Sequence, residues 1–227
     1  MDDFKGDSAV MQTDTLASHI ARLYGWMFAG LMVTGVVAGF VVASNILLTP
    51  TMLLLLLVAE VALVWGLSAR AMKMEFASAA TWFIVYSGLN GLTLSTIFYA
   101  YTSGSIAMAF LISALFFGFM SVYGLVTKND LTSMGSLLFM GLIGVVIASV
   151  VNMFLGSPAL DWLISFIGVA VFLGLTAYNT QGIKQTYAMY AGTPKERNVA
   201  IIGALTLYLN FINLFLFILR ILGRRSD

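Results

Sequence analysis

Polar and small residues recur at helical spacing in the last apolar stretch of the chain, residues 198–223. Gly203, Thr206, Asn210 and Asn213 fall on one side of a helix, whereas Leu, Ile and Phe cover its other sides. An amide left unpaired in hydrocarbon costs several kcal/mol, so this side must face protein or water. We therefore expect a central helix enclosed by the others. The alternative is that these amides only join helices, through hydrogen bonds worth about 0.6 kcal/mol each.

One carboxylate, Glu60, falls in the middle of the second apolar stretch. A charge at the centre of a bilayer costs about 2.5–3.5 kcal/mol on insertion scales, so Glu60 requires a partner, a proton or a water-filled cavity. Arg70 ends the same stretch, too far along the helix to form an intrahelical pair with Glu60. We interpret Arg70 as an anchor at the membrane surface, with a gating contact to another helix as the alternative.

The sixth apolar stretch carries Thr176 and Asn179 on one helical face near its end. Asn179 can meet the amides of the last helix there, because two amides can donate and accept hydrogen bonds reciprocally without charge. The third stretch carries Tyr86, Asn90 and Thr93 along one side, which we interpret as a packing stripe.

Composition excludes several classes of protein. Hydrophobic residues make up 60% of the chain, charged residues 9%, and the mean hydropathy is +0.98, which indicates a multi-pass membrane protein in a lipid bilayer. The net charge of +1, without a basic patch, argues against nucleic acid as a partner. Cysteine is absent, and His19 is the single histidine; we interpret it as solvated or interfacial. No nucleophile and base pair can be assembled, so we expect no enzymatic activity and no cofactor.

Seven apolar stretches have the length of about 20 residues that a bilayer requires. We predict an all-α integral membrane protein whose polar N-terminal tail, residues 1–21, becomes helical from about Thr15. A single seven-helix domain, residues 22–227, follows, and three prolines (Pro50, Pro158 and Pro194) lie between its spans. The predicted spans are residues 23–44, 51–69, 77–100, 105–126, 133–155, 160–180 and 199–222.

Loop charges predict the orientation. The N-terminal side and the even-numbered loops together carry eight Lys and Arg residues, and the odd-numbered loops carry none. This pattern places the N-terminus in the cytoplasm. The exception is the C-terminal end, where Arg220, Arg224 and Arg225 lie at and just after the end of the seventh stretch. Either the last helix crosses against the rule, which we favour, or it is re-entrant.

Glycine pairs in the apolar stretches are candidate helix-packing sites, because small residues let helices approach closely. The pairs are Gly35 and Gly39, Gly88 and Gly91, and Gly141 and Gly144.

Long segments of the sequence resemble the Bax inhibitor-1 family, also called the transmembrane Bax-inhibitor-motif family, and its bacterial branch in particular. The segments are LYGWMFAGL (23–31), YSGLNGLTLSTIF (86–98), MSVYGLVTKNDL (120–131), LFMGLIGVVIASVVN (138–152), GLTAYNTQGIK (174–184) and ALTLYLNFINLFLFILRILG (204–223). The resemblance implies a seven-helix fold in which six helices wrap the last, a bacterial inner-membrane location, and a pH-sensitive calcium leak.

The chain departs from the family at two positions. The resemblance places Asn179 and Asn210 where the family usually has an aspartate pair that senses pH by sharing a proton. Amides do not titrate, so we expect the proton switch at this site to be lost. It also implies transient calcium near these amides, no tightly bound metal, and a part for Glu60 and Arg70 in the ion path or its closure. From the polar stripe and the sixth stretch we add Thr176, Thr206 and Asn213 as candidates for the path.

An alternative function is a non-transporting modulator of a membrane protease or of a stress response, as some bacterial relatives are thought to be. It would act by contacts such as those of the loop at residues 181–198, with Lys184, Lys195 and Arg197.

Overall fold

The computed structural model describes residues 15–224. Within that range, seven helices are long and apolar enough to cross a membrane and no β-strand forms, which confirms the predicted all-α membrane fold. The elements are α1 (Leu16–Ala43), α2 (Pro50–Arg70), α3 (Phe76–Leu94), α4 (Ile97–Ala100), α5 (Ser103–Val126), the 3₁₀ turn η1 (Thr132–Met134), α6 (Gly135–Leu155), α7 (Pro158–Tyr190) and α8 (Glu196–Leu222).

Two prolines start helices instead of lying between them. Pro50 and Pro158 occupy the first turns of α2 and α7, where the missing N–H costs no hydrogen bond. The preceding Thr49 and Ser157 accept hydrogen bonds from backbone nitrogens of those turns. Local sequence therefore sets where these two spans begin.

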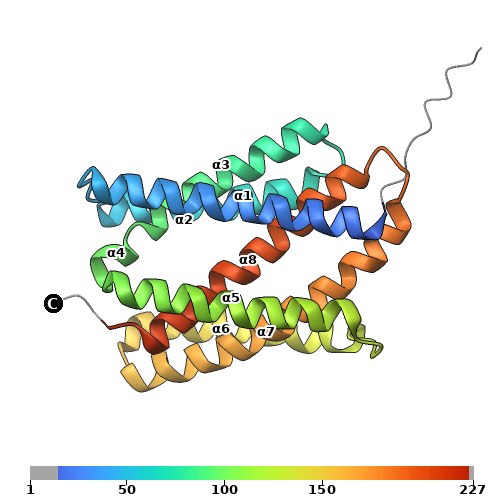
Figure 1. Cartoon of the computed structure of the whole chain (residues 1–227). Helices are drawn as coiled ribbons and strands as arrows, with labels where there is room; N and C mark the ends of the chain where they lie inside the picture. The colour runs from blue at the N-terminus through green and yellow to red at the C-terminus, as the bar shows by residue number, and fades with distance from the viewer. Residues whose placement is uncertain (1–14, 225–227) are drawn as a thin grey trace, which may run out of the picture.

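The last helix, α8, lies at the centre of the bundle. It runs diagonally between a layer of α1, α2 and α3 and a layer of α5, α6 and α7 (Figure 1). Of the most apolar 18-residue stretch in each helix, 67% is buried in α8, compared with 11% in α2 and 6% in α6. The sequence predicts six helices around the last one; in the structure α1, α3, α5 and α7 form most of the wall, while α2 packs mainly on α3 and α6 mainly on α7.

The third span is interrupted, although the sequence predicts one helix over residues 77–100. α3 ends at Leu94, and the short helix α4 follows after a turn. The hydroxyls of Ser95 and Thr96 donate to the carbonyls of Leu92 and Thr93, at 2.6 and 2.8 Å. Hydroxyls that bond to nearby carbonyls compete with helical hydrogen bonds, which accounts for the break.

The sixth span extends ten residues beyond the predicted end at residue 180. α7 continues to Tyr190, so the loop predicted at residues 181–198 is reduced to a short turn before α8. Lys184 Nζ donates to the carbonyl of Leu125 at the end of α5, at 2.7 Å. The guanidinium of Arg197 lies over the ring of Phe76. Two of the three basic residues assigned to a partner surface thus have contacts within the protein.

The first helix begins at Leu16, inside the predicted polar tail, and Thr15 is its N-cap as expected. The rest of that tail, residues 1–14, lies outside the described residues. His19 is fully buried, and its ring lies 4.8 Å from that of Tyr187 on α7. The interpretation of His19 as a solvated or interfacial residue is therefore wrong. The reason is that α7 continues past its apolar part, and this polar extension, which carries Tyr187, covers the start of α1.

Only some of the predicted glycine sites bring helices together. A Cβ added to Gly91 would lie 2.6 Å from the carbonyl oxygen of Thr34, so α1 and α3 touch there. Gly141 faces Val171 of α7. The other four face open space, so their spacing does not mark a helix contact; they are Gly35, Gly39, Gly88 and Gly144.

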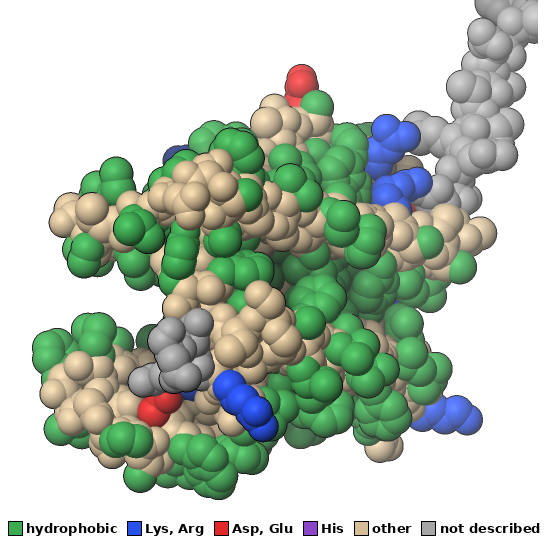
Figure 2. Space-filling view, turned by 60° about the vertical axis from the view of Figure 1, so that its left-hand side comes forward, with side chains coloured by type: hydrophobic (Ala, Val, Ile, Leu, Met, Phe, Trp, Pro, Cys, Tyr) green, Lys and Arg blue, Asp and Glu red, His purple; other side chains and the backbone are tan. Residues whose placement is uncertain are grey.

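Apolar side chains cover most of the face that Figure 2 shows, and few charged side chains interrupt them. The outward residues of α2 and α6 are mainly Leu, Val, Ile, Met and Phe. A surface of this kind is suited to acyl chains and not to water.

The last helix crosses the bundle. α8 is continuous, and its end lies on the side opposite the start of α1 (Figure 1), so the re-entrant alternative is wrong. At that far end, Arg220 Nη1 lies 3.4 Å from Asp161 Oδ1 in the first turn of α7. This ion pair compensates one of the three arginines that depart from the positive-inside pattern.

Candidate functional site

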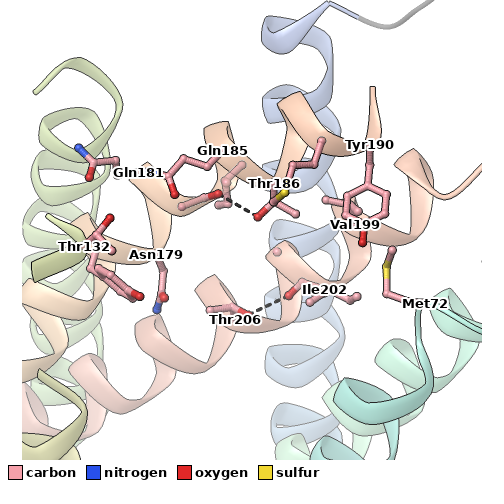
Figure 3. Close-up of a pocket in the computed structure, with 15 residues that line it drawn as sticks. Met72, Thr132, Asn179, Gln181, Gln185, Thr186, Tyr190, Val199, Ile202 and Thr206 are labelled. Carbon is pink, nitrogen blue, oxygen red and sulfur yellow. Dashed lines mark hydrogen bonds between the residues drawn. The ribbon is translucent and has the colours of Figure 1, made fainter. Parts of the chain in front are cut away.

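A cavity of about 480 Å³ lies between the second half of α7 and the first half of α8. It is at the end of the bundle predicted to be cytoplasmic. Asn179 of α7 and Thr206 of α8 both line it (Figure 3). The other lining residues are neutral: Met72, Thr132, Tyr178, Gln181, Gly182, Ile183, Gln185, Thr186, Met189, Tyr190, Val199, Ile202 and Gly203.

The two predicted sensor positions lie close to this cavity but do not bond to each other. Asn179 is half-buried and lines the cavity, whereas Asn210 is 5% exposed and lies one helical turn beyond Thr206. Among the described residues, Asn210 Nδ2 has no hydrogen-bond partner. The expected reciprocal pair of amides is therefore not formed.

The other polar residues predicted along α7 and α8 bond to their own helices. Thr176 donates to the carbonyl of Phe172 at 2.7 Å, Thr206 to that of Ile202 at 3.0 Å, and Asn213 Nδ2 to that of Leu209 at 2.8 Å. Because a helix supplies the fourth preceding carbonyl to each of them, they need no partner from another helix.

Gln181 forms two hydrogen bonds with the backbone of the α5–α6 loop at the rim of the cavity. Its Oε1 accepts from the backbone nitrogen of Leu131, and its Nε2 donates to the carbonyl of Asn129, both at 2.8 Å. Sequence reasoning did not single out Gln181, although its place three residues before Lys184, on the extension of α7, signals a polar face.

Glu60 has two hydrogen-bond donors from α3. Asn90 Nδ2 donates to Oε2 at 3.1 Å, and Thr93 Oγ1 donates to Oε1 at 2.5 Å. Glu60 is 7% exposed. The polar residues of α3 that we interpreted as a packing stripe are therefore, in part, the partners of the membrane-embedded acid.

The hydrogen bonds continue from Asn90 to the central helix. Tyr208 Oη of α8 donates to Asn90 Oδ1 at 3.0 Å and lies 2.6 Å from Thr34 Oγ1 of α1. Thr34 Oγ1 also lies 2.9 Å from each of the carbonyl oxygens of Gly30 and Ser87. Thr34 and Tyr208 were not predicted, because in the sequence they are a lone threonine and an aromatic residue in apolar stretches. We call Glu60, Asn90, Thr93, Tyr208 and Thr34 the buried polar network.

The structure does not bring all candidate residues to one place. Glu60 lines a separate cavity between α2, α3 and α8, with none of the residues around Asn179. Arg70 is exposed at the end of α2 and, among the described residues, pairs with no acid. This exposed position favours the interpretation of Arg70 as an anchor over that of a gating contact.

Neither cavity has a dense set of metal ligands. No acidic side chain lines the cavity at Asn179, and residues 15–224 hold no group of three or more His, Asp or Glu suited to a metal ion. The oxygens at Asn179, Thr206 and Thr132 are neutral, so a cation there would be held by dipoles alone.

Comparisons with known proteins agree with this architecture. Residues 16–227 match the family described as inhibitor of apoptosis-promoting Bax1. The chain is 47% identical over 233 residues to the inner membrane protein YbhL of Escherichia coli K12, covering 99% of this chain and 100% of that protein. It is 43% identical over 218 residues to an uncharacterized protein of Borreliella burgdorferi, covering 92% of each chain. It is also 43% identical over 167 residues to an uncharacterized membrane protein of Streptococcus pyogenes serotype M1, covering 74% of this chain and 72% of that one.

The family match and the match to the Escherichia coli protein extend over almost the whole seven-helix bundle, and the latter is a protein of the bacterial inner membrane. They confirm both the resemblance that the sequence segments carry and the predicted membrane. The chain belongs to the Bax inhibitor-1 family and is a multi-pass protein of a bacterial inner membrane.

Proposed function

We propose that the protein is a calcium-leak channel in which Asn179 and Asn210 stand where relatives keep a proton-sensing aspartate pair. Calcium would enter the cavity at Asn179 and Thr206 from the cytoplasmic end and pass Asn210 in the bundle. Glu60 would be the remaining acid of the membrane interior. Thr176 and Asn213, whose polar hydrogens already bond to their own helices, would have a packing role.

The observation that carries the proposal is the buried amide of Asn210. Its Nδ2 atom has no partner among the described residues, and it lies one turn beyond a residue that lines the cavity. Buried donors without a partner are rare in native proteins, and this one calls for a water molecule as its acceptor. An atom of this kind next to a cavity of about 480 Å³ supports a hydrated route at the α7–α8 contact.

The proposal also specifies how this channel differs from its relatives. Two neighbouring carboxyls share a proton, which raises one apparent pKa of the pair, whereas two amides keep the same charge at every physiological pH. Calcium affinity falls as the charge of its ligands falls, so amide oxygens would hold calcium only transiently. We therefore expect a leak with weak calcium binding and no pH gating at this site.

Calcium flux from loaded vesicles tests the proposal. The purified chain is reconstituted in liposomes with an enclosed calcium indicator, and the flux is measured at pH 6 and pH 8. We expect similar flux at the two pH values for the natural sequence. The double variant Asn179→Asp and Asn210→Asp should acquire a steep pH dependence. Asn45→Asp makes the same chemical change in the exposed turn after α1, away from Asn179 and Asn210. This control variant should not acquire a pH dependence.

Two results would overturn the proposal. One is a steep pH response of the natural sequence that disappears only when Asn179 or Asn210 is changed. The other is the absence of any flux above that of empty liposomes. In the second case, co-purification of a membrane protease would favour a modulator that acts by protein contact.

A further inference from the structure

A second cavity, of about 440 Å³, lies beside Glu60 on the outer side of α2 and α3. Its lining residues are Glu60, Val61, Val64, Trp65, Ser68, Tyr86 and Leu209. Val61 and Trp65 are 70% and 77% exposed on a helix that faces acyl chains. The cavity therefore opens sideways, towards the lipid.

The carboxylate in this cavity lacks a counter-ion. Among the residues that the structure describes, no Lys, Arg or His pairs with Glu60. Asn90 and Thr93 supply neutral hydrogen-bond donors only. A buried carboxylate with neutral partners is far from compensated, so it attracts a positive charge from outside the protein.

The other walls fit an organic cation better than a metal ion. Trp65 and Tyr86 present aromatic rings, which attract cations through their π faces. Among the side chains that line the cavity, Ser68 and Tyr86 add one hydroxyl oxygen each to those of Glu60, too few to replace the water shell of a calcium ion. The volume falls within the range of roughly 300–1,000 Å³ that is typical of small-molecule sites.

We infer that this lateral cavity binds a hydrophobic organic cation that enters from the bilayer, with Glu60 as its counter-ion and Trp65 as an aromatic wall. The inference concerns binding alone and holds whether or not the protein conducts calcium. Its failure would leave the flux proposal untouched, and the reverse is also true.

Binding of tetraphenylphosphonium to the full chain in lipid nanodiscs tests the inference. This probe is a permanent cation with an apolar surface. We expect saturable binding that Glu60→Gln weakens by about tenfold or more and Trp65→Leu by about threefold. Glu75→Gln removes the same charge at the start of α3, outside the cavity, and should have no effect. Trp82→Leu, at a lipid-exposed tryptophan of α3 that does not line the cavity, is the control for Trp65.

A second variant separates loss of the site from loss of the fold. Val61→Trp fills the cavity from its lipid side and leaves Glu60 and its donors unchanged, so binding should be lost. Val58→Trp adds the same bulk one turn away and should bind the probe normally. The inference fails if Glu60→Gln and Val61→Trp bind tetraphenylphosphonium like the natural sequence. It also fails if neutral triphenylphosphine oxide binds equally well and with the same sensitivity to Glu60→Gln.

Discussion

Asn90 donates a hydrogen bond to Glu60 at 3.1 Å, and this contact ties α2 to α3 inside the membrane. Glu60 and Leu67 are the two buried residues of α2. A helix with so little buried surface gains little from packing, because hydrocarbon tails solvate its apolar residues as well as protein does. The polar contact is therefore an important determinant of where α2 lies.

Tyr208→Phe should destabilise the bundle at the other end of the buried polar network. The change removes the hydroxyl that contacts Thr34 and Asn90 and leaves the Asn90 Oδ1 atom without its donor. An unsatisfied buried acceptor costs about 1–3 kcal/mol, so we expect a lower midpoint of thermal unfolding in detergent. Tyr123→Phe, on the partly exposed Tyr123 of α5, is the control. Equal midpoints for both variants would mean that the network contributes nothing to stability.

Gly91→Ala should separate α1 from α3. The added methyl group would lie 2.6 Å from the carbonyl oxygen of Thr34, too close for the backbones to keep their contact. Overpacking of this kind costs about 1–3 kcal/mol. Gly88→Ala, one turn earlier on the same helix, meets open space and should be neutral or slightly stabilising, since alanine is the better helix former. The two thermal midpoints test this, and a midpoint for Gly91→Ala as high as that for Gly88→Ala would contradict the prediction.

Hydropathy predicted the fold class well, because a bilayer imposes one length and one polarity on every span. The errors lie at the ends of the predicted spans. Whether Ser95 and Thr96 break a helix depends on where their hydroxyls bond, and α7 extends past Asn179 because its polar end packs on the α5–α6 loop. Neither the helix break at Ser95 and Thr96 nor the extension of α7 changes the average hydropathy of a stretch. Hydropathy alone therefore could not predict them.

The candidate site was predicted in part. The family resemblance singled out Asn179 and Asn210 as a pair; in the structure Asn179 lines the cavity between α7 and α8, whereas Asn210 lies one turn beyond Thr206 on α8 and is not among the lining residues. The partners of Glu60 were not found, because a sequence does not say which helices are neighbours. Tyr208 was missed because its hydroxyl bonds to Asn90 and Thr34, which lie 118 and 174 residues away in the sequence.

The α5–α6 loop should respond to acid through Asp130. The hydroxyl and the backbone nitrogen of Thr132 hydrogen-bond to this carboxylate and hold its pKa below the ordinary value. Because the pKa is lowered in the folded state, the stabilisation is present above the ordinary pKa and is lost as the pH falls through the lowered one. Thr132→Val should raise the pKa of Asp130 in an NMR titration of its carboxyl carbon. Thr127→Val, in the same loop, should leave it unchanged, and a rise in both variants would contradict this assignment.

The crossing of α8 places its C-terminal end on the same side as the turn after α1, opposite the α7–α8 turn. The chain has no cysteine, so single cysteines can report the side of each segment. In intact bacteria, a membrane-impermeant maleimide should label Arg224→Cys and Asn45→Cys, because both positions are exposed at the end of the bundle that the positive-inside pattern predicts to be outside. Thr193→Cys, exposed in the α7–α8 turn, should be labelled only after lysis. Labelling of Arg224→Cys together with Thr193→Cys would contradict the crossing, and the reversed pattern at all three positions would contradict the positive-inside orientation.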